Sequence, residues 1–193
     1  MGGERLKMKK ILLLGAMLLS LNVHAKELAG VAVADSVQVG GQTLVLNGAG
    51  IRTKFFFKIY VGALYLPQKQ TSGEAIIADE HPHRMALHIL HELSSEKLFN
   101  AVKDAMEDNQ TAAGMAALAE QMQQMGKIFD TVKMVKPGDV ITLDYLPDSG
   151  TQISVNGTVC GTISGVAFNR ALLKIWLGEK PIQADLKKEL LGG

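Results

Sequence analysis

The sequence has few of the residues that stabilise or activate small proteins through covalent chemistry. Cys160 is the single cysteine among 193 residues, so the chain cannot form an internal disulfide and must be stabilised by packing. It lies in an apolar run without an adjacent base, which favours a buried and unreactive thiol over a catalytic one. The formal net charge is only +1. Because no basic patch interleaved with aromatic residues is present, nucleic acid is not an expected partner.

Familiar catalytic and metal-binding motifs are also missing. The chain has no Gly-x-Ser-x-Gly, no phosphate-binding loop and no His-Glu-x-x-His. Four of the five histidines fall between His81 and His91, a clustering that raises the possibility of a metal site. Their spacing matches no regular ligand set, and on a strand His88 and His91 would face opposite sides. We therefore expect neither a metal site nor a cofactor.

The N-terminus has the pattern of a secretory signal peptide. Lysines at positions 7, 9 and 10 precede an apolar run over residues 11–21, and Val23 and Ala25 supply small residues for cleavage. The apolar run is too short to span a bilayer as a helix. We expect cleavage after Ala25, with Met8 as an alternative start. Residues 26–193 would then form one exported domain without a membrane anchor, periplasmic if the source is a Gram-negative bacterium.

The longest aromatic and β-branched segment after the signal peptide runs from Gly48 to Leu66. Its alternation predicts one strand with an apolar face that includes Val61, and a second, mixed face that includes Tyr60. Arg52 follows two glycines that would permit a bend. The mixed face is interpreted either as the solvated side of a central strand or as the polar corner of a ligand site.

The rest of the chain alternates between groups of strands and groups of helices. Gly40-Gly41 and Asn156-Gly157 predict tight hairpins, and Ser94-Ser95 and Thr111 predict helix caps. Strands are expected at 28–39, 43–46, 84–93, 140–146, 151–155 and 158–163, and helices at 73–78, 97–107, 115–132, 168–177 and 184–191. This grouping predicts an α+β fold with an antiparallel sheet covered on one face. The methionine-rich stripe of the helix at 115–132 is interpreted as core packing or as the wall of a pliable apolar pocket.

Arg52 and Tyr60 form the candidate binding group. A guanidinium binds a carboxylate or an enolate-like oxygen through two parallel hydrogen bonds, and a phenol can donate another. On one continuous strand, however, the two residues would be separated by roughly 26 Å. They can converge only if the chain bends sharply between them or if Arg52 folds back.

Several segments resemble the chalcone isomerase family. These are Gly50–Phe55 with Lys58–Leu66, the passage His88–Phe99, the hairpins at 138–151 and 155–157, and the segment Phe168–Gly178 followed by Pro181. The resemblance covers nearly the whole chain after the signal peptide and points to bacterial exported members of the family. It implies a curved antiparallel sheet with helices on one face, an open-faced sandwich, and a ligand cleft between the two layers.

The family includes plant isomerases, plastid fatty-acid binders and bacterial proteins without an assigned activity, so the resemblance implies three alternatives. Arg52 matches the family arginine that polarises a carbonyl in the isomerases or holds a carboxylate in the binders. Tyr60 matches the binders, and Asn169 lies near a hydroxyl position of the late helix. The middle-helix tyrosine and asparagine of the isomerases have no counterpart within 115–132.

The favoured hypothesis is a non-catalytic binder of a fatty acid or similar amphipathic acid, in a cleft headed by Arg52. One alternative is an isomerase, or intramolecular lyase, acting on a small enone or phenolic compound. The other is a protein-interaction module with a vestigial cleft, although the sequence identifies no protein partner.

Overall fold

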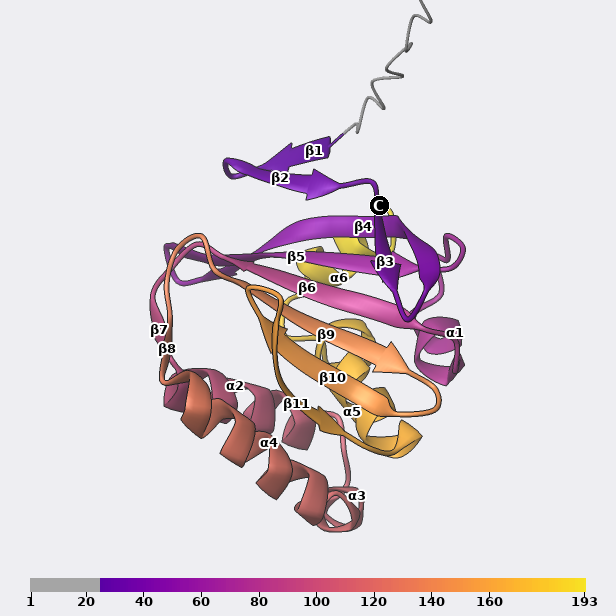
Figure 1. The fold of residues 1–193 in the computed structure, drawn as a ribbon, viewed down its shortest axis with the longest axis vertical. Helices are drawn as coiled ribbons and strands as arrows, with labels where there is room; N and C mark the ends of the chain where they lie inside the picture. The colour runs from indigo at the N-terminus through magenta and orange to yellow at the C-terminus, as the bar shows by residue number, and fades with distance from the viewer. Residues whose placement is uncertain (1–24) are drawn as a thin grey trace, which may run out of the picture.

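The computed structural model describes residues 25–193, so the predicted signal peptide, apart from Ala25, lies outside the described residues. Its centre is a curled antiparallel sheet of seven strands in the order β11-β10-β9-β6-β5-β4-β3 (Figure 1). The strands are β3 (Ser36–Val39), β4 (Gln42–Lys54), β5 (Phe57–Leu66), β6 (His83–Ile89), β9 (Val140–Leu146), β10 (Gly150–Val155) and β11 (Thr158–Ile163). Two small antiparallel pairs accompany it, β1 (Ala25–Leu28) with β2 (Val31–Ala34) and β7 (Leu93–Ser94) with β8 (Met134–Val135).

The helices pack against one face of this sheet, which confirms the predicted α+β open-faced sandwich (Figure 1). They are α1 (Gly73–Ala78), α2 (Ser95–Asp108), α3 (Ala112–Ala117), α4 (Ala119–Val132), α5 (Val166–Leu177) and α6 (Ala184–Leu190). The main core joins them to inward-facing sheet residues such as Leu64 and Met85. A smaller core forms on the other face, where Val33 of β2 packs with Val61 and Tyr65. The β1–β2 hairpin therefore covers part of the face that has no helices.

The segment expected to be one long strand is instead a hairpin. β4 and β5 pair antiparallel and are joined by a turn at Phe55-Phe56, with Lys54 opposite Phe57. The prediction failed because the turn contains no glycine, proline or asparagine, and its phenylalanines continue the strand-like pattern. The predicted period of two still describes β5, but the mixed face bearing Tyr60 and Leu64 meets the helices and main core.

Other expected elements are shorter or divided. The strand predicted at 28–39 consists of three strands, because the chain turns at Ala29-Gly30 and breaks again at Asp35. The strand expected to reach residue 93 ends at Ile89. Thr111 caps α3 as predicted, but the following helical run is interrupted at Leu118, which lies between α3 and α4. Cys160 lies in the edge strand β11 and is half-buried, whereas the sequence predicted a buried thiol.

Gly48 and Gly50 allow α6 to lie directly on β4. A Cβ atom at Gly48 would be 2.1 Å from the Glu189 carbonyl oxygen. At Gly50 it would clash with the Glu189 carboxylate, which accepts a hydrogen bond from the Ile51 amide at 3.3 Å. The sequence predicts that these two glycines permit a bend near the ligand site. The structure shows that their role is a close backbone approach between a strand and a helix.

Among the described residues, no helix combines the length and apolar character needed to cross a membrane.

Candidate functional site

Arg52 and Tyr60 lie directly opposite each other on β4 and β5. Opposed residues in an antiparallel pair project to the same face of the sheet, so the hairpin brings together the two residues that one strand would separate. The pairing register shifts between Arg52 and Thr53, and the carbonyl of the extra residue, Ile59, accepts hydrogen bonds from the Leu90 and His91 amides. Such a bulge bends the strand and redirects neighbouring side chains.

The Arg52 guanidinium is partly exposed and only partly engaged. Its Nη1 donates to the carbonyl of Thr53 and, over 3.2 Å, to Gln183 Oε1. Gln183 is itself fixed to β4, since it accepts from the Thr53 amide and donates to the Ile51 carbonyl. Within residues 25–193, Nε and Nη2 of Arg52 donate to no protein acceptor, so that edge can receive a bidentate carboxylate.

Tyr60 places a phenol at the buried side of this pair. Its hydroxyl oxygen accepts a hydrogen bond of 2.9 Å from Trp176 Nε1 of α5. Burial raises the pKa of Tyr60 to about 12, although the Trp176 bond and the Arg52 charge act in the opposite direction. The phenol is therefore neutral at physiological pH. Its own proton has no acceptor among the described side chains and can be donated to a ligand oxygen.

An enclosed apolar cavity of about 30 Å³ lies between the sheet and the helices. Its lining comes from the sheet (Leu87, Ile141, Leu143, Ile153), α2 (Leu98, Val102), α4 (Met125, Phe129) and α5 (Leu172, Trp176). Trp176 connects the two features, because its ring lines the cavity while its Nε1 contacts Tyr60. Tyr60, the buried member of the pair, and the cavity therefore meet at one side chain.

Asn169, the third candidate residue, lies elsewhere. It is buried in the first half of α5, with Oδ1 placed 3.1 Å from His83 Nε2. His83 begins β6, whereas Ile89 at its other end pairs with Tyr60, so about 20 Å of strand separates the two positions. The structure thus brings Arg52 and Tyr60 together but does not bring Asn169 to them.

Asn169 instead belongs to a buried polar contact around His83. Burial lowers the pKa of His83, and the neutral ring contacts the His81 carbonyl through Nδ1 at 3.1 Å and stacks on Tyr145. Asn169 Nδ2 has no partner among the described residues. With the amide turned by 180°, Nδ2 donates to His83 Nε2 and both groups are satisfied. The contact joins α5 to the start of β6.

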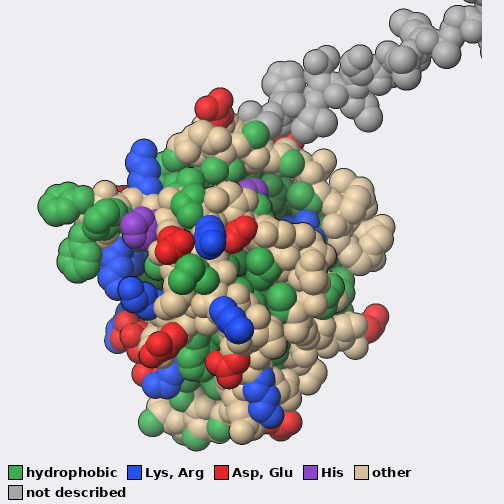
Figure 2. All heavy atoms as spheres, turned by 60° about the vertical axis from the view of Figure 1, so that its left-hand side comes forward, with side chains coloured by type: hydrophobic (Ala, Val, Ile, Leu, Met, Phe, Trp, Pro, Cys, Tyr) green, Lys and Arg blue, Asp and Glu red, His purple; other side chains and the backbone are tan. Residues whose placement is uncertain are grey.

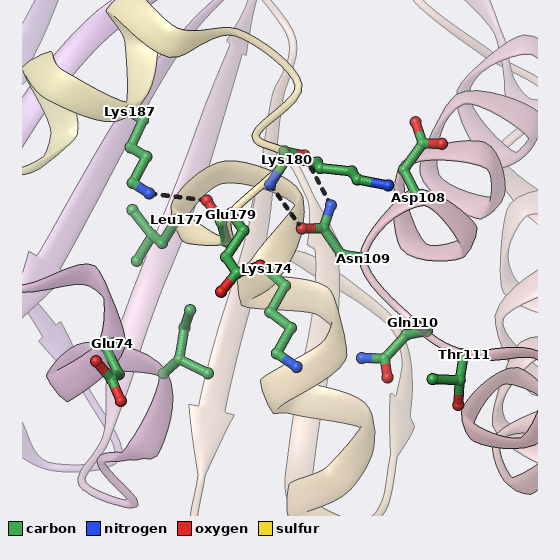
Figure 3. A pocket seen from close by; sticks show the side chains of 12 residues that line it. Glu74, Asp108, Asn109, Gln110, Thr111, Lys174, Leu177, Glu179, Lys180 and Lys187 are labelled. Carbon is green, nitrogen blue, oxygen red and sulfur yellow. Dashed lines mark hydrogen bonds between the residues drawn. The ribbon is translucent and has the colours of Figure 1, made fainter.

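A separate hollow of about 650 Å³, lined mostly by polar and charged residues, lies at the ends of α2 and α5 (Figure 3). Lys174, Lys180 and Lys187 line it together with three acidic residues, so its charges nearly balance. Asn109 exchanges two hydrogen bonds with the backbone of Lys180, and Lys187 Nζ donates to the Gly178 carbonyl. Because these contacts close the junction between helices, and neither Arg52 nor Tyr60 lines the hollow, we assign it a structural role.

Trp176 and Gln183 are the site residues that sequence reasoning did not identify. Trp176 is the single tryptophan, and its position seven residues after Asn169 places it two turns farther along α5. The presence of a single tryptophan was the feature of the sequence that could have identified Trp176. Gln183 carries no comparable signal, because its role depends on the docking of α6 onto β4.

The sequence profile of the chalcone isomerase-like family matches residues 25–192. The chain belongs to this family. The chalcone isomerase-like fold is also seen in the crystal structure of a fatty-acid binding protein from Arabidopsis thaliana, with a TM-score of 0.69 and 15% sequence identity. That match covers 84% of this chain and 92% of the plant protein. A comparison with curated protein sequences gives no significant match.

Proposed function

We propose that this chalcone isomerase-like protein binds a fatty acid or similar amphipathic acid without transforming it. The observation that carries the proposal is the Arg52–Tyr60 pair, whose buried member, Tyr60, is joined to an apolar cavity through Trp176. A cation and a neutral phenol suit a carboxylate, and an apolar cavity suits an alkyl chain. The fold shared with the plant fatty-acid binding protein supports the same class of ligand.

In the proposed complex, the carboxylate replaces solvent at the free edge of the Arg52 guanidinium. Tyr60 donates its proton to the second carboxylate oxygen while still accepting from Trp176. Gln183 accepts a hydrogen bond from Arg52 Nη1 and so restrains the guanidinium before the ligand binds. This restraint lowers the entropic cost of ordering the arginine on binding. The binding group is thus prepared by β4, β5, α5 and the N-terminus of α6.

The cavity must enlarge to accept an acyl chain, because pockets for small ligands usually measure about 300–1,000 Å³. Met125 and Phe129 of α4 form part of its wall. A methionine side chain adapts readily to an irregular apolar shape, which gives the methionine-rich stripe a function beyond core packing. We infer that the acyl chain enters between α4 and the sheet.

Two features of the site give less support to the alternative function, isomerase catalysis. None of the ten side chains that line the cavity titrates. Tyr60, with a pKa of about 12, is a poor general base at neutral pH. We further propose, from the lysines and apolar run before Ala25, that the protein acts after export, in the periplasm of a Gram-negative cell.

Native mass spectrometry of the exported protein tests the proposal, with Arg52→Ala as the test variant and Lys69→Ala as the control. Lys69 is an exposed cation that follows β5 and lies outside the hairpin tip. We expect a lipid-sized adduct on the wild-type protein and on Lys69→Ala, and its loss from Arg52→Ala. A wild-type protein that carries no adduct and also fails to take up added fatty acids would refute the proposal.

A further inference from the structure

Three consecutive phenylalanines form the tip of the β4–β5 hairpin. Phe55, Phe56 and Phe57 are 84%, 96% and 56% exposed. Figure 2 shows hydrophobic side chains projecting from one edge of the molecule, with basic side chains beside them. Phenylalanine has no polar atom with which to offset such exposure. A contiguous exposed apolar group of this kind marks an interaction site.

The backbone of the tip is also unfavourable for these residues. Phe55 has φ of 55° in a two-residue turn, a conformation that favours glycine at this position. A bulky side chain in the left-handed region is a genuine outlier. Neither packing nor local geometry accounts for a phenylalanine here, and strained residues of this type cluster at functional sites.

Basic side chains flank the tip on both strands. Lys54 ends β4 and Lys58 follows Phe57 on β5, and both are exposed. Within the described chain, neither lysine forms an ion pair. Exposed His91 contacts the Phe57 ring, with 4.9 Å between ring centroids, and the acidic residue beside it is Glu92. The tip therefore combines an apolar end with unpaired positive charges directly behind it.

We propose that this hairpin tip docks reversibly on the surface of a lipid bilayer that contains anionic headgroups. The phenylalanine rings would enter the boundary between headgroups and acyl chains, where apolar side chains leave water. Lys54 and Lys58 have flexible stems that let their ammonium groups stay at headgroup level. There they are attracted to anionic lipids. A protruding tip with this charge pattern matches a membrane surface better than the apolar groove of a protein partner.

The docking surface and the candidate acid site lie on the same hairpin. Arg52 is three residues from Phe55, and Tyr60 is three residues from Phe57. A tip held at the bilayer would place the binding group next to the source of fatty acids, so that a ligand could pass between membrane and cavity. This coupling rests on the proposed function. Docking itself does not require that function.

Vesicle sedimentation tests the proposal with the protein purified after export, its N-terminus determined by mass spectrometry. The vesicles are phosphatidylcholine with phosphatidylglycerol, and phosphatidylcholine alone. The variants are Phe55→Ser/Phe56→Ser and Lys54→Gln/Lys58→Gln. Val159→Ser is the control, because Val159 is a 54% exposed apolar residue on the edge strand β11. A Phe56→Trp variant reports insertion directly, through quenching by brominated acyl chains.

We expect the wild-type protein and Val159→Ser to bind anionic vesicles equally. The serine pair should lower partitioning at least tenfold, and the glutamine pair should lower it about tenfold on anionic vesicles only. Equal binding of the wild type and the serine pair, or no quenching of Phe56→Trp, would overturn the proposal. So would a tip that mediates dimerisation or capture of a protein instead of vesicle binding. Because docking requires no fatty acid, a negative result leaves the adduct test of the proposed function independent.

Discussion

The Tyr60 hydroxyl accepts a hydrogen bond of 2.9 Å from the indole nitrogen of Trp176. This bond joins the central hairpin to α5 and leaves the phenolic proton available for donation. It also keeps a polar contact satisfied at the wall of an apolar cavity, where an unpaired donor would be costly. The same contact thus stabilises the fold and, in the proposed complex, leaves Tyr60 free to donate to the ligand.

The Tyr60→Phe substitution removes both functions of this hydroxyl. We expect a loss of about 1–3 kcal/mol in the free energy of unfolding, because Trp176 Nε1 is left buried without an acceptor. Affinity for a fatty acid should fall roughly tenfold or more, since one hydrogen bond to the carboxylate is lost. Denaturant unfolding and calorimetric titration measure the two effects.

Fatty acid methyl esters provide a control for the Arg52→Ala variant. An ester keeps the acyl chain but has no negative charge, so Arg52→Ala should change ester affinity much less than acid affinity. Equal losses for acid and ester would show that Arg52 supports the structure and does not hold the ligand head.

The turn at Phe55 predicts a conflict between stability and docking. Phe55→Gly should stabilise the protein by about 1 kcal/mol, because glycine adopts the observed φ of 55° without strain. Phe56, which has no positive φ, serves as the matched site, and Phe56→Gly should give no such gain. Both variants should bind anionic vesicles less well. Thermal unfolding of the two variants side by side decides whether the strain is real.

Two glycine-to-alanine changes should have opposite effects, because only Gly48 lies where α6 approaches β4. Gly48→Ala should destabilise the fold by about 3 kcal/mol or more, because its Cβ would be 2.1 Å from the Glu189 carbonyl oxygen. Gly126→Ala on α4 should stabilise it by about 0.5–1 kcal/mol, since its Cβ would meet Phe99 at an ordinary 3.6 Å. Chemical denaturation measures both, and a neutral Gly48→Ala would contradict the proposed packing role.

Burial of His83 predicts a loss of stability in mild acid. Its pKa is lowered in the folded protein from the ordinary value of 6.5, so the unfolded chain takes up the proton first. The free energy of unfolding should therefore fall as pH decreases through 6.5 towards the lowered pKa, and His83 should contribute no slope well above 6.5, where both states are deprotonated. The measurement is denaturant unfolding at a series of pH values between about 8 and 5, a range above the ordinary carboxylate pKa values.

His83→Gln removes this titrating group and should reduce the slope. Burial also lowers the pKa of His88, so part of the slope should persist in that variant and disappear in a double variant with His88→Gln. A wild-type protein with constant stability across this pH range would contradict the burial of a neutral His83.

Enlargement of the cavity should favour ligand binding but lower the stability of the ligand-free protein. Met125→Ala is expected to cost about 2–5 kcal/mol of stability, because Met125 is fully buried at the cavity wall. Saturating fatty acid should restore more stability to this variant than to the wild type, since the chain fills the added space. If the melting temperature of this variant does not change when fatty acid is added, the cavity is excluded as the acyl site.

Much of the fold was predictable from local patterns. Asn156-Gly157 predicted the hairpin between β10 and β11, where both residues have positive φ. Ser94 predicted the start of α2, where its side chain accepts from the Lys97 amide. In both cases the interactions that fix the local structure, a turn conformation and a capping hydrogen bond, lie within a few residues of chain. The division of 28–39 and the interruption at Leu118 were missed because none of these breaks carries a strong turn residue pair.

The sequence by itself determined the residue types of the candidate site, since a guanidinium and a phenol, Arg52 and Tyr60, have the chemistry expected of a carboxylate-binding pair. It also determined the α+β class, because alternation and helical spacing persist over whole segments. Only the tertiary structure decided that Arg52 and Tyr60 converge, because the chain reverses direction at Phe55-Phe56. It also decided that Asn169 contacts His83 and not this pair. Pairing register and helix docking join residues more than 100 positions apart, as Trp176 and Tyr60 are, and local chemistry cannot encode such a contact.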